Sequence, residues 1–129
     1  MDAAQALADL TEISSQIEAA VLFDESGAVQ GSTLADEGAA AELARGAADL
    51  LTRAAGFRGE GVVTQLEAAT NAGSVFVVQD GSRRIAATTG PQPTVGLVFY
   101  DLKSALRNAA AEPAKPKRAP RREKADDEA

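Results

Sequence analysis

Two short runs of this 129-residue chain are apolar at every position, at residues 19–23 and 75–78. Continuous apolar runs of this length are typical of strands that are covered on both faces of a sheet. A sheet covered on both faces needs one layer of helices above it and another below it. The two runs therefore favour a three-layer arrangement of helix, sheet and helix.

Five runs have the length and composition of strands. The expected strands cover residues 19–24, 28–33, 61–69, 74–79 and 82–88. Glu25-Ser26-Gly27 is a turn signal after the first run, and Asp80-Gly81 is a strong hairpin signal between the last two. Because the connections between the last three strands are short, we expect those strands to form an antiparallel meander.

The run at residues 61–69 alternates in character, which predicts a half-buried strand. Its apolar-rich face is expected to carry Val62, Thr64, Leu66 and Ala68. Val63 is expected to point to the opposite face. Gly31 interrupts the second expected strand and indicates a sheet edge or a bulge there.

Three segments show helical periodicity, at residues 2–18, 36–55 and 94–110. The apolar arc of the first consists of Ala3, Ala6, Leu7, Leu10, Ile13 and Ile17. Asp2 and Asp36 stand at helix starts, where an acidic side chain suits the free N–H groups and the helix dipole.

The middle helix has an unusually wide apolar face. Its alanines and leucines cover roughly 180°, whereas a helix that rests on one surface has a stripe of about 100°. One flank could contact the chain's own sheet and the other a second subunit. Alternatively, alanine is simply abundant here because it is the best helix former.

The element order is therefore α-β-β-α-β-β-β-α. We predict an α/β fold, a three-layer α/β/α sandwich around one five-stranded, mostly antiparallel sheet. The helix between the second and third strands should cross one face, and the first and last helices should cover the other. The ordered domain is expected to span residues 1–111.

The composition excludes several classes of function. The chain has no Cys and no His, so it lacks thiolate and imidazole metal ligands and the usual neutral-pH general base. Residues 1–111 hold 7 basic and 14 acidic side chains, a net charge of −7, which argues against specific nucleic-acid binding. No run approaches the ~18 apolar residues of a membrane span, and no signal peptide is evident, so we expect a cytoplasmic protein.

The last 18 residues, 112–129, differ sharply from the rest of the chain. Prolines alternate with charges, no aliphatic residue larger than Ala occurs, and segment 115–124 has 6 basic residues and 1 acidic residue. Such a segment cannot bury enough surface to offset its ordering entropy, so we expect a disordered, charged tail. It could solubilise the protein or make weak contact with an anionic surface.

Several segments resemble the Roadblock family, which is named for dynein light chains. They are the opening helix with Leu7, Leu10, Ile13 and Ile17, the strand and turn at residues 19–27, and the alanine-rich helix that follows. The meander at 61–89 and Val95-Gly96-Leu97 before a last helix with Leu102 and Leu106 complete the resemblance. It spans residues 2–111 and depends on the order of elements rather than on one diagnostic motif.

The resemblance implies a homodimer or heterodimer in which the middle helices of two subunits pack together and neighbouring edge strands join the two sheets. Here those elements would be residues 38–55 and 61–68. The candidate interface residues are Ala40, Leu43, Ala44, Ala47, Leu50, Leu51, Ala54, Val62, Thr64 and Leu66. It also implies a scaffold or regulator that binds a small Ras-like GTPase, as bacterial members often do.

No catalytic, cofactor-binding or metal-binding residues are expected. Arg45, Arg53 and Arg58 could act as an arginine finger on a GTPase, but the first two are better explained as partners of Asp49 at four-residue spacing. The Gly-rich segment 56–61 follows a helix and lacks the Lys-Ser/Thr of a phosphate loop, so it is interpreted as a helix end.

A second hypothesis is a small-ligand sensor of the profilin-like or GAF-like kind, or a purely structural dimerisation module. A sensor needs a mostly apolar cavity with converging polar groups. The chain has only 4 Phe, 1 Tyr and no Trp to line such a cavity, which favours the scaffold.

Overall fold

The computed structural model describes residues 2–57, 59 and 61–110. The helices are α1 (Ala3–Ile13), α2 (Glu37–Gly56) and α3 (Val95–Ala110). The strands are β1 (Ile17–Asp24), β2 (Val29–Ser32), β3 (Gln65–Thr70), β4 (Gly73–Asp80) and β5 (Arg83–Thr89). This is the predicted order of elements. The tail expected at 112–129 lies outside the described residues.

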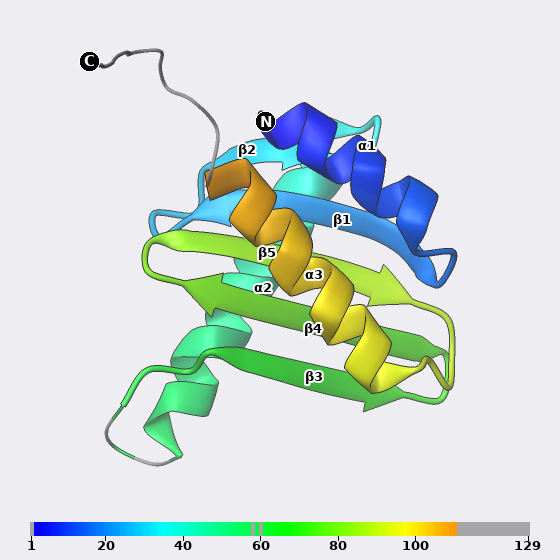
Figure 1. Ribbon diagram of the computed structural model, residues 1–129. Helices are drawn as coiled ribbons and strands as arrows, with labels where there is room; N and C mark the ends of the chain where they lie inside the picture. Colours follow the sequence, from blue (N-terminus) through cyan, green and yellow to red (C-terminus); the bar gives the residue numbers. More distant parts are fainter. Residues whose placement is uncertain (1, 58, 60, 111–129) are drawn as a thin grey trace, which may run out of the picture.

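The five strands form one sheet in the order β2-β1-β5-β4-β3, and every neighbouring pair is antiparallel. Helices α1 and α3 lie side by side on one face of this sheet, and α2 crosses the other (Figure 1). The predicted three-layer sandwich is therefore confirmed. The strands at the two edges are β2 and β3.

Each face of the sheet has its own core. On the α1/α3 face, Phe76, Ile85 and Leu102 are fully buried. On the α2 face, Val21, Val77 and Ala86 are fully buried with the alanines of α2. Strands β1, β4 and β5 thus contribute buried side chains to both layers, which explains their continuous apolar runs.

The first predicted helix is too long at its C-terminal end. Helix α1 ends at Ile13, and Ser14 takes an extended conformation while its N–H still donates to the Leu10 carbonyl. Ile17, expected on the helix, instead begins β1 opposite Thr89 of β5. Strand pairing has overridden the helical periodicity, and Ile13 is left 71% exposed.

The predicted strand at residues 61–69 begins too early. Gly59 and Gly61 have φ values of 82° and 86°, a left-handed conformation that residues with a side chain rarely adopt. The chain is still turning at these positions, so β3 starts only at Gln65. The other expected strands and helices match the observed elements to within two residues at each end.

The turn after β1 is organised by the Asp24 carboxylate. Its Oδ1 accepts the Ser26 hydroxyl at 2.6 Å, the Ser26 N–H at 2.9 Å and the Ala28 N–H at 3.1 Å. The Ser26 hydroxyl, followed by the backbone N–H of Ala28, lowers the pKa of Asp24 below its ordinary value of 3.8. The charged carboxylate therefore stabilises this turn.

We expect Asp24→Ala to lower the free energy of unfolding at neutral pH, and the loss to vanish in acid. Because the folded-state pKa is lowered, the stabilisation is present above 3.8 and disappears as the pH falls through the folded-state pKa. Urea unfolding of both proteins at pH values from about 7 to about 2 measures this difference. Glu25→Ala, one residue along, is the control, and an equal loss at every pH would contradict the proposed charge effect.

Candidate partner surface on the second helix and the edge strand

Helix α2 presents one face to its own sheet and leaves one flank partly uncovered. Ala40, Ala44, Ala47 and Leu51 are buried against the sheet. These four predicted interface positions are core positions of the single chain, because α2 needs their small side chains to approach β1 closely. They are therefore not available to a partner, and the candidate interface narrows to the other six.

The uncovered flank of α2 has a seven-residue repeat. Leu43, Leu50 and Phe57 are spaced by seven, and Gly46 and Ala54 lie between them on the same side of the helix. Leu43 and Leu50 are half-buried, while Phe57, directly after α2, is 92% exposed. A seven-residue apolar repeat with small residues between is typical of a helix that packs on another helix.

Strand β3 lies at the edge of the sheet and pairs only with β4 among the described residues. Leu66 stands opposite Val77, and Ala68 opposite Val75, so these four side chains share the α2 face. Leu66 and Val75 are only half-buried, although both contact the core on this face. An edge strand with an incompletely covered apolar face is a ready site for pairing with another strand.

The segment before β3 departs from the predicted alternation. Val63 packs against the α2-side core, whereas Val62 is 75% exposed, the reverse of the expected pattern. Thr64 is exposed, and its carbonyl accepts the Gln79 N–H at 2.9 Å. Val62 is thus an accessible apolar side chain, as an interface residue would need, but outside the strand.

Phe57 was missed by the sequence analysis, which interpreted its surroundings only as a helix end. The signal was present: a lone aromatic residue in a Gly-rich segment, seven positions after Leu50. Thr64, another of the six remaining candidates, instead lines a hollow with Lys103 and Arg107 of α3. The remaining surface, which consists of Leu43, Leu50, Ala54, Phe57, Val62 and Leu66, is named the α2–β3 surface.

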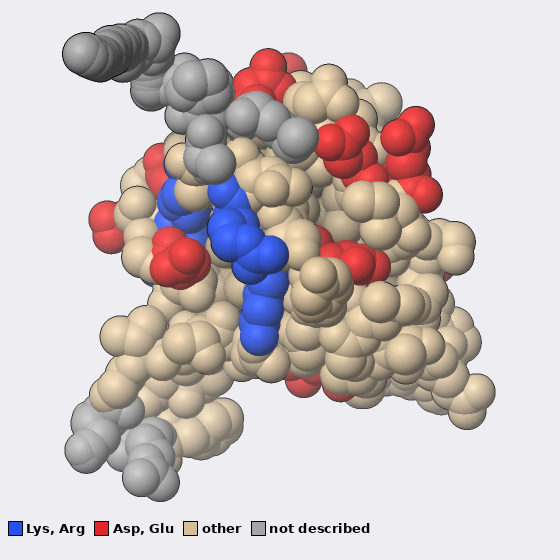
Figure 2. Space-filling model, in the orientation of Figure 1, with Lys and Arg blue, Asp and Glu red and all other residues tan. Residues whose placement is uncertain are grey.

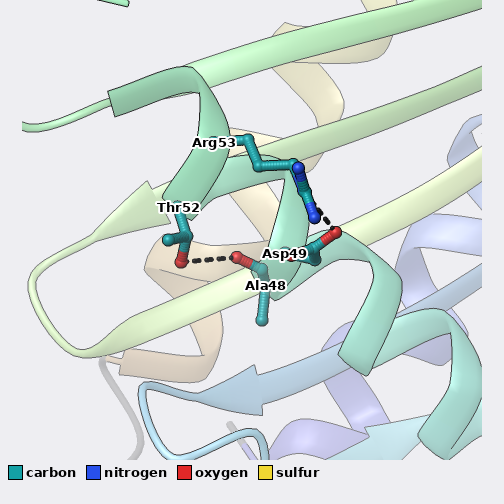
Figure 3. Close-up of polar contacts among 4 residues, drawn as sticks. All are labelled: Ala48, Asp49, Thr52 and Arg53. Carbon is teal, nitrogen blue, oxygen red and sulfur yellow. Dashed lines mark hydrogen bonds and ion pairs between the residues drawn. The ribbon is translucent and has the colours of Figure 1, made fainter. Parts of the chain in front are cut away.

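The solvent-facing side of α2 is polar. The Arg53 Nε lies 2.9 Å from the Asp49 Oδ2, and the Thr52 hydroxyl donates to the Ala48 carbonyl at 3.1 Å (Figure 3). The expected pairing of Arg53 with Asp49 is therefore confirmed. It is the only ion pair within residues 2–57, 59 and 61–110. The expected pairing of Arg45 with Asp49 is therefore not formed. Arg58, the third arginine considered, lies outside the described residues.

Within the described part of the chain, no three His, Cys, Asp or Glu side chains lie close enough to hold a metal ion. Two larger surface hollows, of about 600 and 630 Å³, lie beside the Pro91–Pro93 turn and beside β2. Neither is lined by an aromatic side chain, whereas small-molecule sites are lined mainly by hydrophobic and aromatic groups.

None of the described helices is long and apolar enough to span a membrane.

Comparisons with known proteins identify the fold. No family model and no curated protein matches the sequence. A solved Roadblock/LC7 domain from Streptomyces avermitilis superposes with a TM-score of 0.75 at 21% identity, over 85% of this chain and 96% of that one.

Two further solved structures are similar. MglB from Myxococcus xanthus gives a TM-score of 0.65 at 16% identity, over 90% of this chain and 88% of that one. MglB in a tetrameric arrangement gives 0.66 at 17% identity, over 84% of this chain and 85% of that one. The chain therefore has the Roadblock/LC7 fold, as the resemblance in its sequence implied.

Proposed function

We propose that this protein is a dimeric scaffold that binds and regulates a small Ras-like GTPase. The observation that carries the proposal is the α2–β3 surface, where a half-covered flank of α2 lies on the same side of the sheet as Leu66 of β3. Strand β3 is an edge strand that pairs only with β4 among the described residues. Exposed apolar side chains such as Phe57 and Val62 would lose contact with water in such an assembly, which favours association.

In the proposed dimer a two-fold axis passes beside β3. The two β3 strands pair antiparallel and extend the sheet to ten strands, and the two α2 helices pack flank to flank. A two-fold interface is self-complementary, so each side chain near the axis meets its own copy. Leu43, Leu50 and Phe57 then interdigitate along the helix pair, and Gly46 and Ala54 allow the two backbones to approach.

The GTPase part of the proposal comes from the family. The Roadblock resemblance implies that bacterial members partner with small Ras-like GTPases, and the shared fold with MglB supports that branch. The GTPase would bind a surface that only the dimer completes. A cytoplasmic location belongs to the same proposal, because a chain without Cys suits a reducing compartment.

Regulation would act by docking rather than by donating a catalytic group. Arg53 is held by Asp49 in an ion pair on the exposed side of α2. An arginine finger must instead reach the transferring phosphate of the GTPase. The small-ligand sensor is the weaker hypothesis, since the two larger hollows lack aromatic lining.

We expect Leu50→Glu to convert a dimer into a folded monomer. Two buried glutamates facing each other across the axis repel and lose hydration, while Leu50 lies outside the chain's own core clusters. Light scattering should give about twice the 13.2 kDa chain mass for the wild type and the single mass for the variant.

Thr52→Glu is the matched control, because it places the same charge on the opposite, exposed flank of α2. It should remain dimeric, and circular dichroism should show all three proteins folded. A wild-type monomer at tens of micromolar, or a Leu50→Glu variant that is still a dimer, would contradict the interface.

We expect the wild-type protein to distinguish the nucleotide states of its GTPase. The probes are the Ras-like GTPases of the same genome, each loaded with GDP or with a non-hydrolysable GTP analogue, in isothermal titration calorimetry. One GTPase should bind about tenfold more tightly in one state, a difference of ~1.4 kcal/mol. Leu50→Glu should lose this binding and Thr52→Glu should keep it. A stable dimer that binds none of them would refute the partner but not the interface.

A further inference from the structure

A second surface lies on the opposite side of the sheet, in the groove between α1 and α3. Its volume is about 220 Å³. The lining includes Leu10 and Ile13 from α1 and Tyr100, Asp101 and Asn108 from α3. Because α2 covers the other face, this groove is separate from the α2–β3 surface (Figure 1).

Asp101 is the unusual residue of this groove. It is only 6% exposed, and its Oδ2 has no hydrogen-bond partner among the described residues. Buried side-chain oxygens nearly always have a partner, and a carboxylate prefers a charged donor. The groove therefore contains an acceptor that no donor from residues 2–57, 59 or 61–110 satisfies.

The surroundings of Asp101 are acidic and aromatic. Asp9 lines the same groove, Glu12 is exposed one turn further along α1, and Tyr100 is 65% exposed. Figure 2 shows acidic side chains over α1 and beside α3, whereas the basic side chains gather on the other flank of α3. That other flank includes Lys103 and Arg107, which line a different hollow against β3 and β4.

We propose that the basic segment 113–118 of the chain's own C-terminal tail occupies this groove, with a lysine or arginine against Asp101 and a proline against Tyr100. The segment reads Pro-Ala-Lys-Pro-Lys-Arg. Within residues 115–124 the tail has 6 basic residues and 1 acidic residue, whereas residues 1–111 have a net charge of −7. The charges of tail and groove are thus complementary.

The tail is long enough to reach Asp101. Helix α3 ends at Ala110, and Asp101 lies nine residues earlier, a rise of about 13 Å at 1.5 Å per residue. Lys115 to Arg118 lie five to eight residues after Ala110, and an extended chain covers ~3.4 Å per residue. Those residues can therefore turn back along α3 and span roughly 17–27 Å.

The chemistry of the segment suits an aromatic, acidic groove. Pro113 and Pro116 have the P-x-x-P spacing, and such segments favour the extended polyproline conformation, which loses little entropy when it binds. Basic residues beside the prolines can meet carboxylates such as those of Asp9 and Asp101. Because the tail is tethered, its effective concentration at the groove is about millimolar, so a weak contact suffices.

The experiment uses the full chain labelled at one tail position. The natural sequence has no cysteine, so Ala119→Cys provides a single site for a nitroxide spin label. Amide NMR signals of Asp9 to Ile13 and of Tyr100 to Ser104 should lose at least half their intensity, while those of residues 61–64 stay unchanged. Salt of about 1 M, where the Debye length is ~3 Å, should restore the signals.

Charge reversal separates a groove contact from general attraction. Lys115→Glu, Lys117→Glu and Arg118→Glu together should abolish the broadening, whereas Arg121→Glu, Arg122→Glu and Lys124→Glu, with the same charge change, should keep most of it. In the labelled chain, Asp101→Asn should weaken the broadening and the exposed Asp80→Asn should not. Thermal unfolding checks that both body variants fold.

Two results would overturn the proposal. Broadening confined to the last turn of α3 and equal in all variants would mean that the tail does not occupy the groove. Groove broadening that persists undiminished when excess spin-labelled, unenriched chains are mixed with unlabelled, ¹⁵N-enriched chains would assign the groove to the tail of another copy.

Discussion

The pairing of β1 with β5 is the interaction on which the rest of the structure depends. It joins Ile17 to Thr89 and Asp24 to Arg83, residues far apart in the sequence, in one antiparallel ladder. Without it the opening hairpin and the later meander would be two separate sheets, and a two-stranded hairpin alone is at best marginally stable in water. The pairing also puts both strands at the centre, where Val21 and Ala86 face α2 while Leu22 and Ile85 face α1 and α3.

Much of this architecture is predictable from the sequence because the apolar central strands allow few arrangements of the helices around the sheet. A run such as residues 19–23 cannot expose either face, so the layers follow from it. The peripheral positions are less determined. Ile13 and Ile17 fit one helical arc equally well, and only the ladder with β5 assigns Ile17 to a strand. Val62 and Val63 exchange their expected roles because glycines in the left-handed region delay the start of β3.

The candidate surfaces, too, are predictable from the sequence only in part. The sequence of an alanine-rich helix shows that the side chains on both flanks are small, but it does not show which flank contacts the helix's own sheet. The structure places Ala44 and Ala47 in the core and leaves Leu50 on the uncovered flank. Phe57 is visible in the sequence as a lone aromatic residue, yet its exposure is not. The Asp101 oxygen, which has no partner among the described residues, is buried by the packing of α3 against α1, and no local sequence pattern encodes that packing.

The two edges of the sheet differ in a way that limits assembly size. Strand β2 has four residues, its register against β1 shifts between Leu22 and Phe23, and α1 lies so close that a Cβ on Gly31 would come within 3.1 Å of the Ala3 Cβ. Such a short, irregular and partly covered edge is poorly suited to receive another strand. Among the described strands, this leaves β3 as the edge that is better suited to extension. If two chains pair through β3 as proposed, growth of the sheet by edge pairing would end at two chains, and the dimer would not seed a fibre.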